Sequence, residues 1–106
     1  MNAQGWFVVL VTTANAEEAQ KIAGALVSER LAACCNIVGN VRSIYRWEEK
    51  ICDEGEVLIV IKTRQANFEK LERRVKALHS YKVPEIIALP VEAGSSEYLK
   101  WLGDNS

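Results

Sequence analysis

The stretch WFVVLVTTANAEEAQKIAGALVSER, residues 6–30, decides the fold because its hydrophobic period changes partway along. Its first part, Trp6–Thr13, is rich in β-branched and aromatic side chains and predicts a strand. Asn15 and Glu18 then stand in the positions of a capping box, which marks the start of a helix. The apolar stripe of that helix consists of Ala19, Ile22, Ala23 and Leu26. A strand followed directly by an amphipathic helix is therefore expected.

Strand and helix patterns continue to follow one another through the rest of the chain. The further elements that the patterns predict are strands at 34–47 and 56–63, a helix at 67–79, a strand at 85–91 and a short helix at 95–102. A polar run at residues 48–50 predicts the turn of a long hairpin between the second and third strands. The order βαββαβ plus a tail is that of an α+β ferredoxin-like sandwich, with both helices on one face of an antiparallel sheet. We expect residues 1–106 to form a single such domain.

Three of the predicted strands are apolar on both faces, although two helices can cover only one. FVVLV, VLIVI and IIAL have no polar position, whereas a half-covered sheet should alternate. The strand at 35–47 also exceeds the usual length of roughly 3–10 residues, so its far end would leave an unpaired edge. Both features favour an obligate homo-oligomer that packs sheet to sheet and pairs its hairpins. The alternative cover, the C-terminal tail alone, is too short.

Length and charge place the chain among ordinary globular domains. It has 106 residues and a net charge of -1, and this near-neutral balance gives no general attraction to nucleic acid or to an anionic membrane. The longest apolar run, Trp6–Val11, is far too short to cross a bilayer. Residues 1–5 carry no basic segment, so we expect no secretory signal. Three cysteines without C-x-x-C spacing favour a reducing, cytoplasmic location.

Three longer stretches carry a family resemblance. They are VTTANAEEAQKIAGALVSERLAACCNIV (11–38), SIYRWEEKI (43–51) and LHSYKVPEI (78–86). Together they resemble the CutA family of divalent-cation tolerance proteins over nearly the whole chain. The resemblance implies a ferredoxin-like homotrimer, similar in architecture to the PII signalling trimers. It also implies a link to metal tolerance, with copper or another divalent metal ion as ligand and no required cofactor.

The resemblance marks two candidate metal ligands. Cys34 matches the cysteine of the family pattern A-A-C-V-N, and His79 matches the histidine of H-P-Y-E-V-P-E. The sequence departs from the pattern at Cys35, where valine is usual, and at Glu49, where glycine is usual. It departs again at Lys82, which puts a cation where the family has a glutamate near the histidine.

Strand parity separates the adjacent cysteines, because successive side chains of a strand point to opposite faces. Cys34 and Cys35 therefore cannot both bind the same metal ion, and we expect Cys35 to pack as a small hydrophobic residue. Thiolate and imidazole suit copper, but a closed site generally needs about four ligands. Packing thus remains the leading interpretation of Cys34. For His79, a structural role in the last turn of its helix, where the helix dipole favours a cation, is an equal alternative to a metal-ligand role. Cys52 is expected to be exposed, and any metal site to be weak or shared between subunits.

A second group of side chains predicts a small-molecule cleft. Aromatic rings with a cation and carboxylates are typical walls of such clefts. The fold order lets the end of the third strand and the loop before the fourth approach a neighbour's hairpin. The candidates are Tyr45, Trp47, Glu56, Lys62, Tyr81 and Glu85. Packing of the hairpin aromatics in a subunit interface is the equal alternative.

Two functions from different classes follow, and neither is catalytic. The first is a CutA-type homotrimer that acts in divalent-cation tolerance, copper included. The second is a PII-like signalling or carrier trimer that binds a small polar metabolite between subunits. No nucleophile and acid are visible around the single histidine, and TTANAEE (12–18) lacks the glycines of a phosphate cradle. We therefore expect no enzymatic activity.

Overall fold

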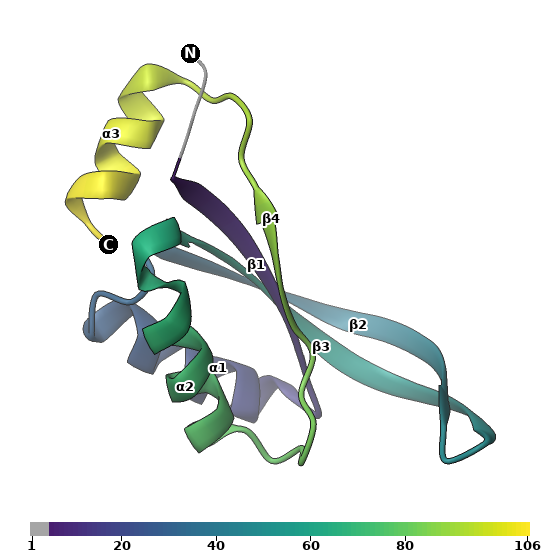
Figure 1. Ribbon diagram of the computed structural model, residues 1–106. Coiled ribbons are helices and arrows are strands. Elements are labelled where there is room, and N and C mark those ends of the chain that lie inside the picture. Colours follow the sequence, from purple (N-terminus) through teal and green to yellow (C-terminus); the bar gives the residue numbers. More distant parts are fainter. Residues whose placement is uncertain (1–4) are drawn as a thin grey trace.

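The structure, a computed structural model, describes residues 5–106 and has the predicted βαββαβ order followed by a third helix (Figure 1). The strands form one antiparallel sheet in the order β2-β3-β1-β4. The elements are β1 (Trp6–Thr13), α1 (Ala16–Ser28), β2 (Cys34–Trp47), β3 (Lys50–Arg64), the 3-10 turn η1 (Gln65–Asn67), α2 (Phe68–Leu78), β4 (Ile86–Pro90) and α3 (Ser96–Asp104). The predicted ferredoxin-like α+β architecture is confirmed. The expectation that no secretory signal is present rests mostly on residues 1–4, which lie outside the described residues.

Helix α1 begins and packs as its sequence predicts. Asn15 Oδ1 accepts the N–H of Glu18 at 2.8 Å, and the Glu18 carboxylate accepts the N–H of Ala14 at 3.0 Å, so both side chains cap the first turn. The predicted apolar stripe is buried and consists of Ala19, Ile22, Ala23 and Leu26. Arg74 of α2 pairs with Glu29, just beyond the end of α1, at an N–O distance of 2.8 Å. This ion pair joins the two helices that cover the sheet.

The sheet has one covered face and one open face. Helices α1 and α2 lie on the same side of it (Figure 1). The fully buried apolar strand residues on that side are Val9, Val11, Ile59 and Ile61. The residues between them point the other way, where Leu10 of β1 stands opposite Val60 of β3 and Ile87 of β4. Ile87 is still 51% exposed, so the prediction of a second apolar face that α1 and α2 leave uncovered is confirmed.

Helix α3 covers only one end of the open face. It lies at the end of the sheet away from the hairpin (Figure 1). A Cβ on Gly103 of this helix would come within 2.6 Å of the ring of Trp6, whose side chain shares the parity of Leu10. The predicted short helix is thus confirmed, and no helix covers the rest of the open face within residues 5–106. None of the helices in residues 5–106 is long and apolar enough to cross a membrane.

Strands β2 and β3 continue past the sheet as a long hairpin. β1 pairs with β3 only over residues 57–64, so the pairs from Val41–Glu56 to Trp47–Lys50 form a two-stranded extension (Figure 1). The sequence predicts that the third strand begins at Glu56, and this boundary is wrong. The strand begins at Lys50, because the polar residues before 56 pair with β2 through their backbones, which side-chain polarity does not report.

The tip of the hairpin is a two-residue turn, one residue shorter than the predicted turn at 48–50. Glu48 and Glu49 both have positive φ, at 49° and 66°, as in a type I′ turn. A residue other than glycine adopts this left-handed conformation at a cost of roughly 1–2 kcal/mol. Glu49 therefore holds a strained position that the glycine of the family pattern would occupy without strain.

Candidate functional site

A cleft opens between the β2–β3 hairpin and the loop that leads into β4. It has a volume of about 770 Å³, which lies in the range of small-molecule sites. Its lining residues are Thr12, Arg42, Ser43, Ile44, Tyr45, Trp47, Glu54, Glu56, Tyr81, Lys82, Val83, Pro84 and Glu85. The structure thus brings together five of the six predicted cleft residues, which are Tyr45, Trp47, Glu56, Tyr81 and Glu85. A single chain forms these walls.

Lys62, the sixth predicted residue, lies elsewhere. β3 and β4 run parallel, because each is antiparallel to β1, and Ile86 at the start of β4 lies level with Ile59. The loop before β4 therefore meets the early part of β3. Lys62 is further along the strand, opposite Cys34 of β2. Lys62 therefore lies apart from Tyr81 and takes no part in the cleft of one chain, and its approach to a neighbour's hairpin stays a prediction.

Two tyrosine–glutamate pairs form part of the cleft wall. The hydroxyl of Tyr81 donates to Glu56 Oε2 at 2.7 Å, and the phenol of Tyr45 lies near the carboxylate of Glu54. Burial, reinforced by the neighbouring carboxylates, raises the pKa of Tyr45 to about 12 and raises the pKa of Tyr81 as well. Both phenols therefore stay protonated at neutral pH, and Tyr81 keeps donating to Glu56.

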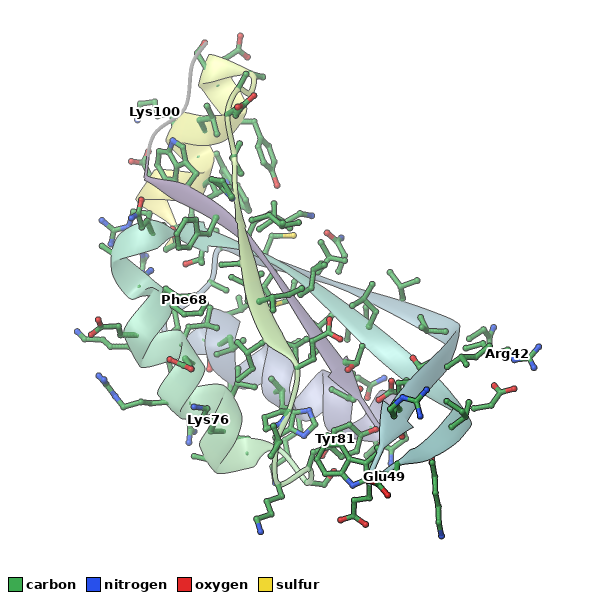
Figure 2. The ribbon with its side chains drawn as sticks, turned by 45° about the vertical axis from the view of Figure 1, so that its right-hand side comes forward. Arg42, Glu49, Phe68, Lys76, Tyr81 and Lys100 are labelled. Atoms are coloured by element: carbon green, nitrogen blue, oxygen red, sulfur yellow. The ribbon has the colours of Figure 1, made fainter. Side chains whose placement is uncertain are left out.

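Tyr81 lies in the loop between α2 and β4 (Figure 2), and a histidine and a glutamate hold this loop in place. The N–H of Tyr81 donates to His79 Nδ1 at 3.0 Å, so Nε2 carries the ring proton and donates to the Thr12 carbonyl at 2.7 Å. Glu18 Oε2 accepts the N–H of Ser80 at 2.8 Å. His79 lies just past the end of α2 in extended backbone, not in the last turn as the sequence predicts. Both of its ring nitrogens are engaged within the protein.

The anchorage of this loop by Glu18 depends on pH. Burial opposes ionisation of the Glu18 carboxyl, but hydrogen bonds from Ser80 and Ala14 outweigh it, and the pKa of Glu18 is lowered. A carboxyl with a depressed pKa stabilises the folded state above its unfolded pKa. That contribution is lost as the pH falls through the folded pKa.

We expect Glu18→Gln to lower the free energy of unfolding at pH 7, because the amide cannot supply the charge that these N–H donors favour. The difference from wild type should shrink as the pH falls from about 5 to about 3, where the wild-type carboxyl becomes protonated. Urea titrations of both proteins at each pH measure this difference. A gap that stays constant down to pH 3 would contradict the role given to the Glu18 charge.

Cys34 and His79, the two predicted metal ligands, do not meet within one chain. Cys34 pairs with Lys62, while Thr12, to which His79 is bonded, pairs with Leu58. Four residues of strand separate these positions, about 13 Å along the sheet, whereas metal–ligand bonds are about 2.0–2.3 Å long. Among the described residues, no group of three His, Cys, Asp or Glu side chains could hold a metal ion. A metal role for either residue stays a prediction.

The adjacent cysteines face opposite sides of the sheet, as strand parity predicts. Cys35 packs against the core, and burial raises the pKa of its thiol to about 12, which makes it a poor metal ligand. Cys34 lies on the open face, with its Sγ 3.9 Å from Asn36 Oδ1. Cys52 is half-buried, not exposed as predicted, because it stands opposite Tyr45 in the hairpin.

Sequence reasoning missed several lining side chains, above all Arg42, Ser43 and Glu54 of the hairpin. Pairing counted back from the turn would have found two of them, because it puts Ser43 opposite Glu54. Arg42 forms a bidentate pair with Asp53, at N–O distances of 2.9 and 2.5 Å, and lowers the pKa of that carboxyl. This pair crosses the hairpin diagonally, since Arg42 stands opposite Gly55 and Asp53 stands opposite Ile44.

The one-sided sheet, the overhanging hairpin and the cleft beside it define a hairpin-extended ferredoxin-like protein. The family model described as "CutA1 divalent ion tolerance protein" matches residues 7–105. The chain belongs to this family, and the resemblance seen in the sequence is confirmed.

Relatives and solved structures of this family match most of the chain. "Divalent-cation tolerance protein CutA" of Thermus thermophilus is 54% identical over 99 residues, which cover 93% of this chain and 96% of the relative. "Protein CutA, chloroplastic" of Arabidopsis thaliana is 48% identical, and the chain spans 54% of its length. The solved structure of the Thermus thermophilus Cut A1 protein has a TM-score of 0.93 at 52% identity, covering 95% of this chain and 98% of that one. CutA1 of Oryza sativa has a TM-score of 0.93 at 46% identity, covering 95% and 93%.

Proposed function

We propose that this protein works as a non-enzymatic homotrimer in divalent-cation tolerance, with copper among the ions concerned. The name of the Thermus thermophilus relative and the description of the family support this role. The single histidine has both ring nitrogens engaged, which supports the lack of a hydrolytic base. Three free cysteines support a reducing, cytoplasmic setting.

The open sheet face is the observation that carries the proposed assembly. Its apolar residues include Leu10, Leu58, Val60, Ile87 and Leu89. Monomeric soluble proteins rarely expose a large contiguous apolar patch, and the hairpin adds unpaired strand edges that invite a partner. Copies of the same chain bring an identical face and hairpin, so they can cover both features in a closed ring. The number three rests on the likeness to the CutA family.

A copper site in this assembly would use Cys34 and be completed by neighbouring subunits. The thiol of Cys34 is on the open face, where we place the other subunits, and thiolates favour Cu(I). One chain offers no group of three ligands among its described residues. His79 would have to give up its contact with Thr12 or with Tyr81 before it could bind an ion, so its part is secondary.

A competition titration with a Cu(I) chelator under reducing conditions tests the copper role. Cys34→Ser should weaken Cu(I) binding by more than the roughly 10–100-fold that loss of a supporting contact costs, because a hydroxyl is a poor soft-metal ligand. Cys35→Val is the matched control, and it should keep the affinity with a stability change below roughly 1.5 kcal/mol. His79→Ala should weaken binding further only if its ring shares the ion. Equal affinity of wild type and Cys34→Ser would remove the cysteine from any metal role.

A second candidate function is a PII-like signalling or carrier role, in which the trimer binds a small polar metabolite. The cleft of about 770 Å³, walled by aromatic and charged side chains, favours it. We place this cleft at the boundary between subunits, because the hairpin that forms one wall projects beyond its own sheet. A thermal-shift screen of metals and metabolites on one preparation separates the two functions. Stabilisation by metal alone supports the first, and stabilisation by a metabolite without metal supports the second.

A further inference from the structure

We propose that the cleft binds an organic cation, an amine attached to an apolar group. This inference rests on the second proposed function, metabolite binding in the cleft, and adds the chemical class of the ligand. Three features of the walls carry it: the sign of their charge, the aromatic rings among the charges, and the spacing of the carboxylates.

The carboxylates of the cleft outweigh its cations. The charged lining residues are Arg42, Glu54, Glu56, Lys82 and Glu85. Arg42 is held in its bidentate pair with Asp53, and its side chain lies at the outer edge of the hairpin (Figure 2). Among the described residues that line the cleft, Lys82, exposed in the loop before β4, is then the one cation left to face three carboxylates. A ligand entering the cleft meets an excess of negative charge, which favours a cation over an anion.

Three aromatic rings stand among these charges. The hydroxyl of Tyr81 is engaged by Glu56, and the phenol of Tyr45 lies near Glu54, so both residues present an aromatic ring beside a carboxylate. Trp47 is 49% exposed at the far end of the lining. A cation over the face of such a ring, within about 6 Å of its centre, is attracted by the ring quadrupole. Rings interleaved with carboxylates are therefore suited to an ammonium that carries an apolar group.

The spacing of the carboxylates disfavours a bare metal ion. Glu54 and Glu56 are two residues apart on one face of β3, so their backbones stand about 7 Å apart. Glu56 already accepts the hydroxyl of Tyr81 with one oxygen. Within residues 5–106, no group of three acidic, histidine or cysteine side chains could hold an ion. An organic amine can span this distance, with its charge against one carboxylate and its apolar part on the rings.

Titration with three probes of similar shape and different charge tests the inference on the assembled wild-type protein. The probes are 2-phenylethylamine as the cation, 2-phenylethanol as the neutral analogue and 3-phenylpropionate as the anion. In nitrogen-15 NMR spectra, the amine should shift the Trp47 indole and Tyr81 amide signals. It should bind at least about tenfold more tightly than the other two probes, because only its charge gains a carboxylate partner. Its affinity should also fall as the salt concentration rises.

Two variants sharpen the test. Glu56→Gln keeps an acceptor for the Tyr81 hydroxyl but removes the charge, so it should weaken amine binding about fivefold or more and leave the alcohol unchanged. Glu72→Gln is the matched control, since Glu72 lies on α2 in an ion pair with Lys76 at 3.2 Å and does not line the cleft. It should bind the amine as wild type does.

Four outcomes overturn the proposal: equal binding of all three probes, tighter binding of the acid, no binding of the amine, or wild-type amine affinity in Glu56→Gln. The thermal-shift screen separates this failure from that of the cleft function. If a metabolite of another charge class still stabilises the protein without metal, the cleft function stands and only the cation class is wrong. If the screen finds no such metabolite either, metabolite binding is overturned together with its ligand class.

Discussion

Val60→Asp is expected to abolish the proposed trimer while leaving each subunit able to fold. Val60 lies on the open face of the sheet, opposite Leu10 of β1 and Asn36 of β2. It is therefore within the apolar surface that we propose meets the other subunits. A carboxylate buried there without a partner costs several kcal/mol in each subunit. The core should be little affected, because position 60 points away from α1 and α2.

Light scattering behind a sizing column measures this effect. Wild type should keep three times the chain mass of 11.9 kDa over a wide range of dilution, and Val60→Asp should lose that species to monomers or precipitate. Val27→Asp is the matched control, because Val27 is 43% exposed on α1, outside the proposed interface. It should stay trimeric. A trimer of Val60→Asp as persistent as that of wild type would contradict the assignment of the interface.

The features that sequence predicted well are those that depend on local periodicity. The stripe of α1, the capping by Asn15 and the opposite directions of Cys34 and Cys35 each follow from spacing within one element. The open face followed from simple geometry, since strands apolar at every position cannot be covered by two helices on one side. Five cleft residues were found because aromatic and charged side chains gather in the hairpin and in the loop before β4.

The features that sequence missed depend on pairing between distant segments. The separation of Lys62 from the cleft of one chain was not visible in the sequence, because the parallel relation of β3 and β4, set through β1, decides which end of β3 the loop meets. The engagement of His79 was not visible, since its partner Thr12 lies 67 residues away in the chain. The bond from Arg42 to Asp53 likewise depends on the hairpin register. These contacts arise from tertiary structure, and no residue spacing reports them.

The same charge placed one residue earlier, in Ile59→Asp, should unfold the subunit instead of separating the trimer. Ile59 is fully buried and stands opposite Val11 on the side that packs against the helices. Truncation of a buried isoleucine costs about 2–5 kcal/mol through lost burial and the cavity left behind. An unpaired carboxylate in the core adds several kcal/mol more. The total approaches or exceeds the 5–15 kcal/mol that stabilises a typical domain.

Far-UV circular dichroism and urea titrations at one fixed protein concentration test this expectation, since association adds to the apparent stability. Ile59→Val should lower the free energy of unfolding by about 0.5–1.5 kcal/mol and Ile59→Ala by about 2–5 kcal/mol, both with the fold retained. These two variants measure the effect of lost side-chain volume without an added charge. Ile59→Asp should show no cooperative transition. A folded Ile59→Asp monomer beside an unfolded Val60→Asp would mean that the covered and open faces had been assigned in reverse. Opposite behaviour of adjacent positions is what a sheet with one face against helices and one face against other subunits requires, because successive side chains point to opposite faces.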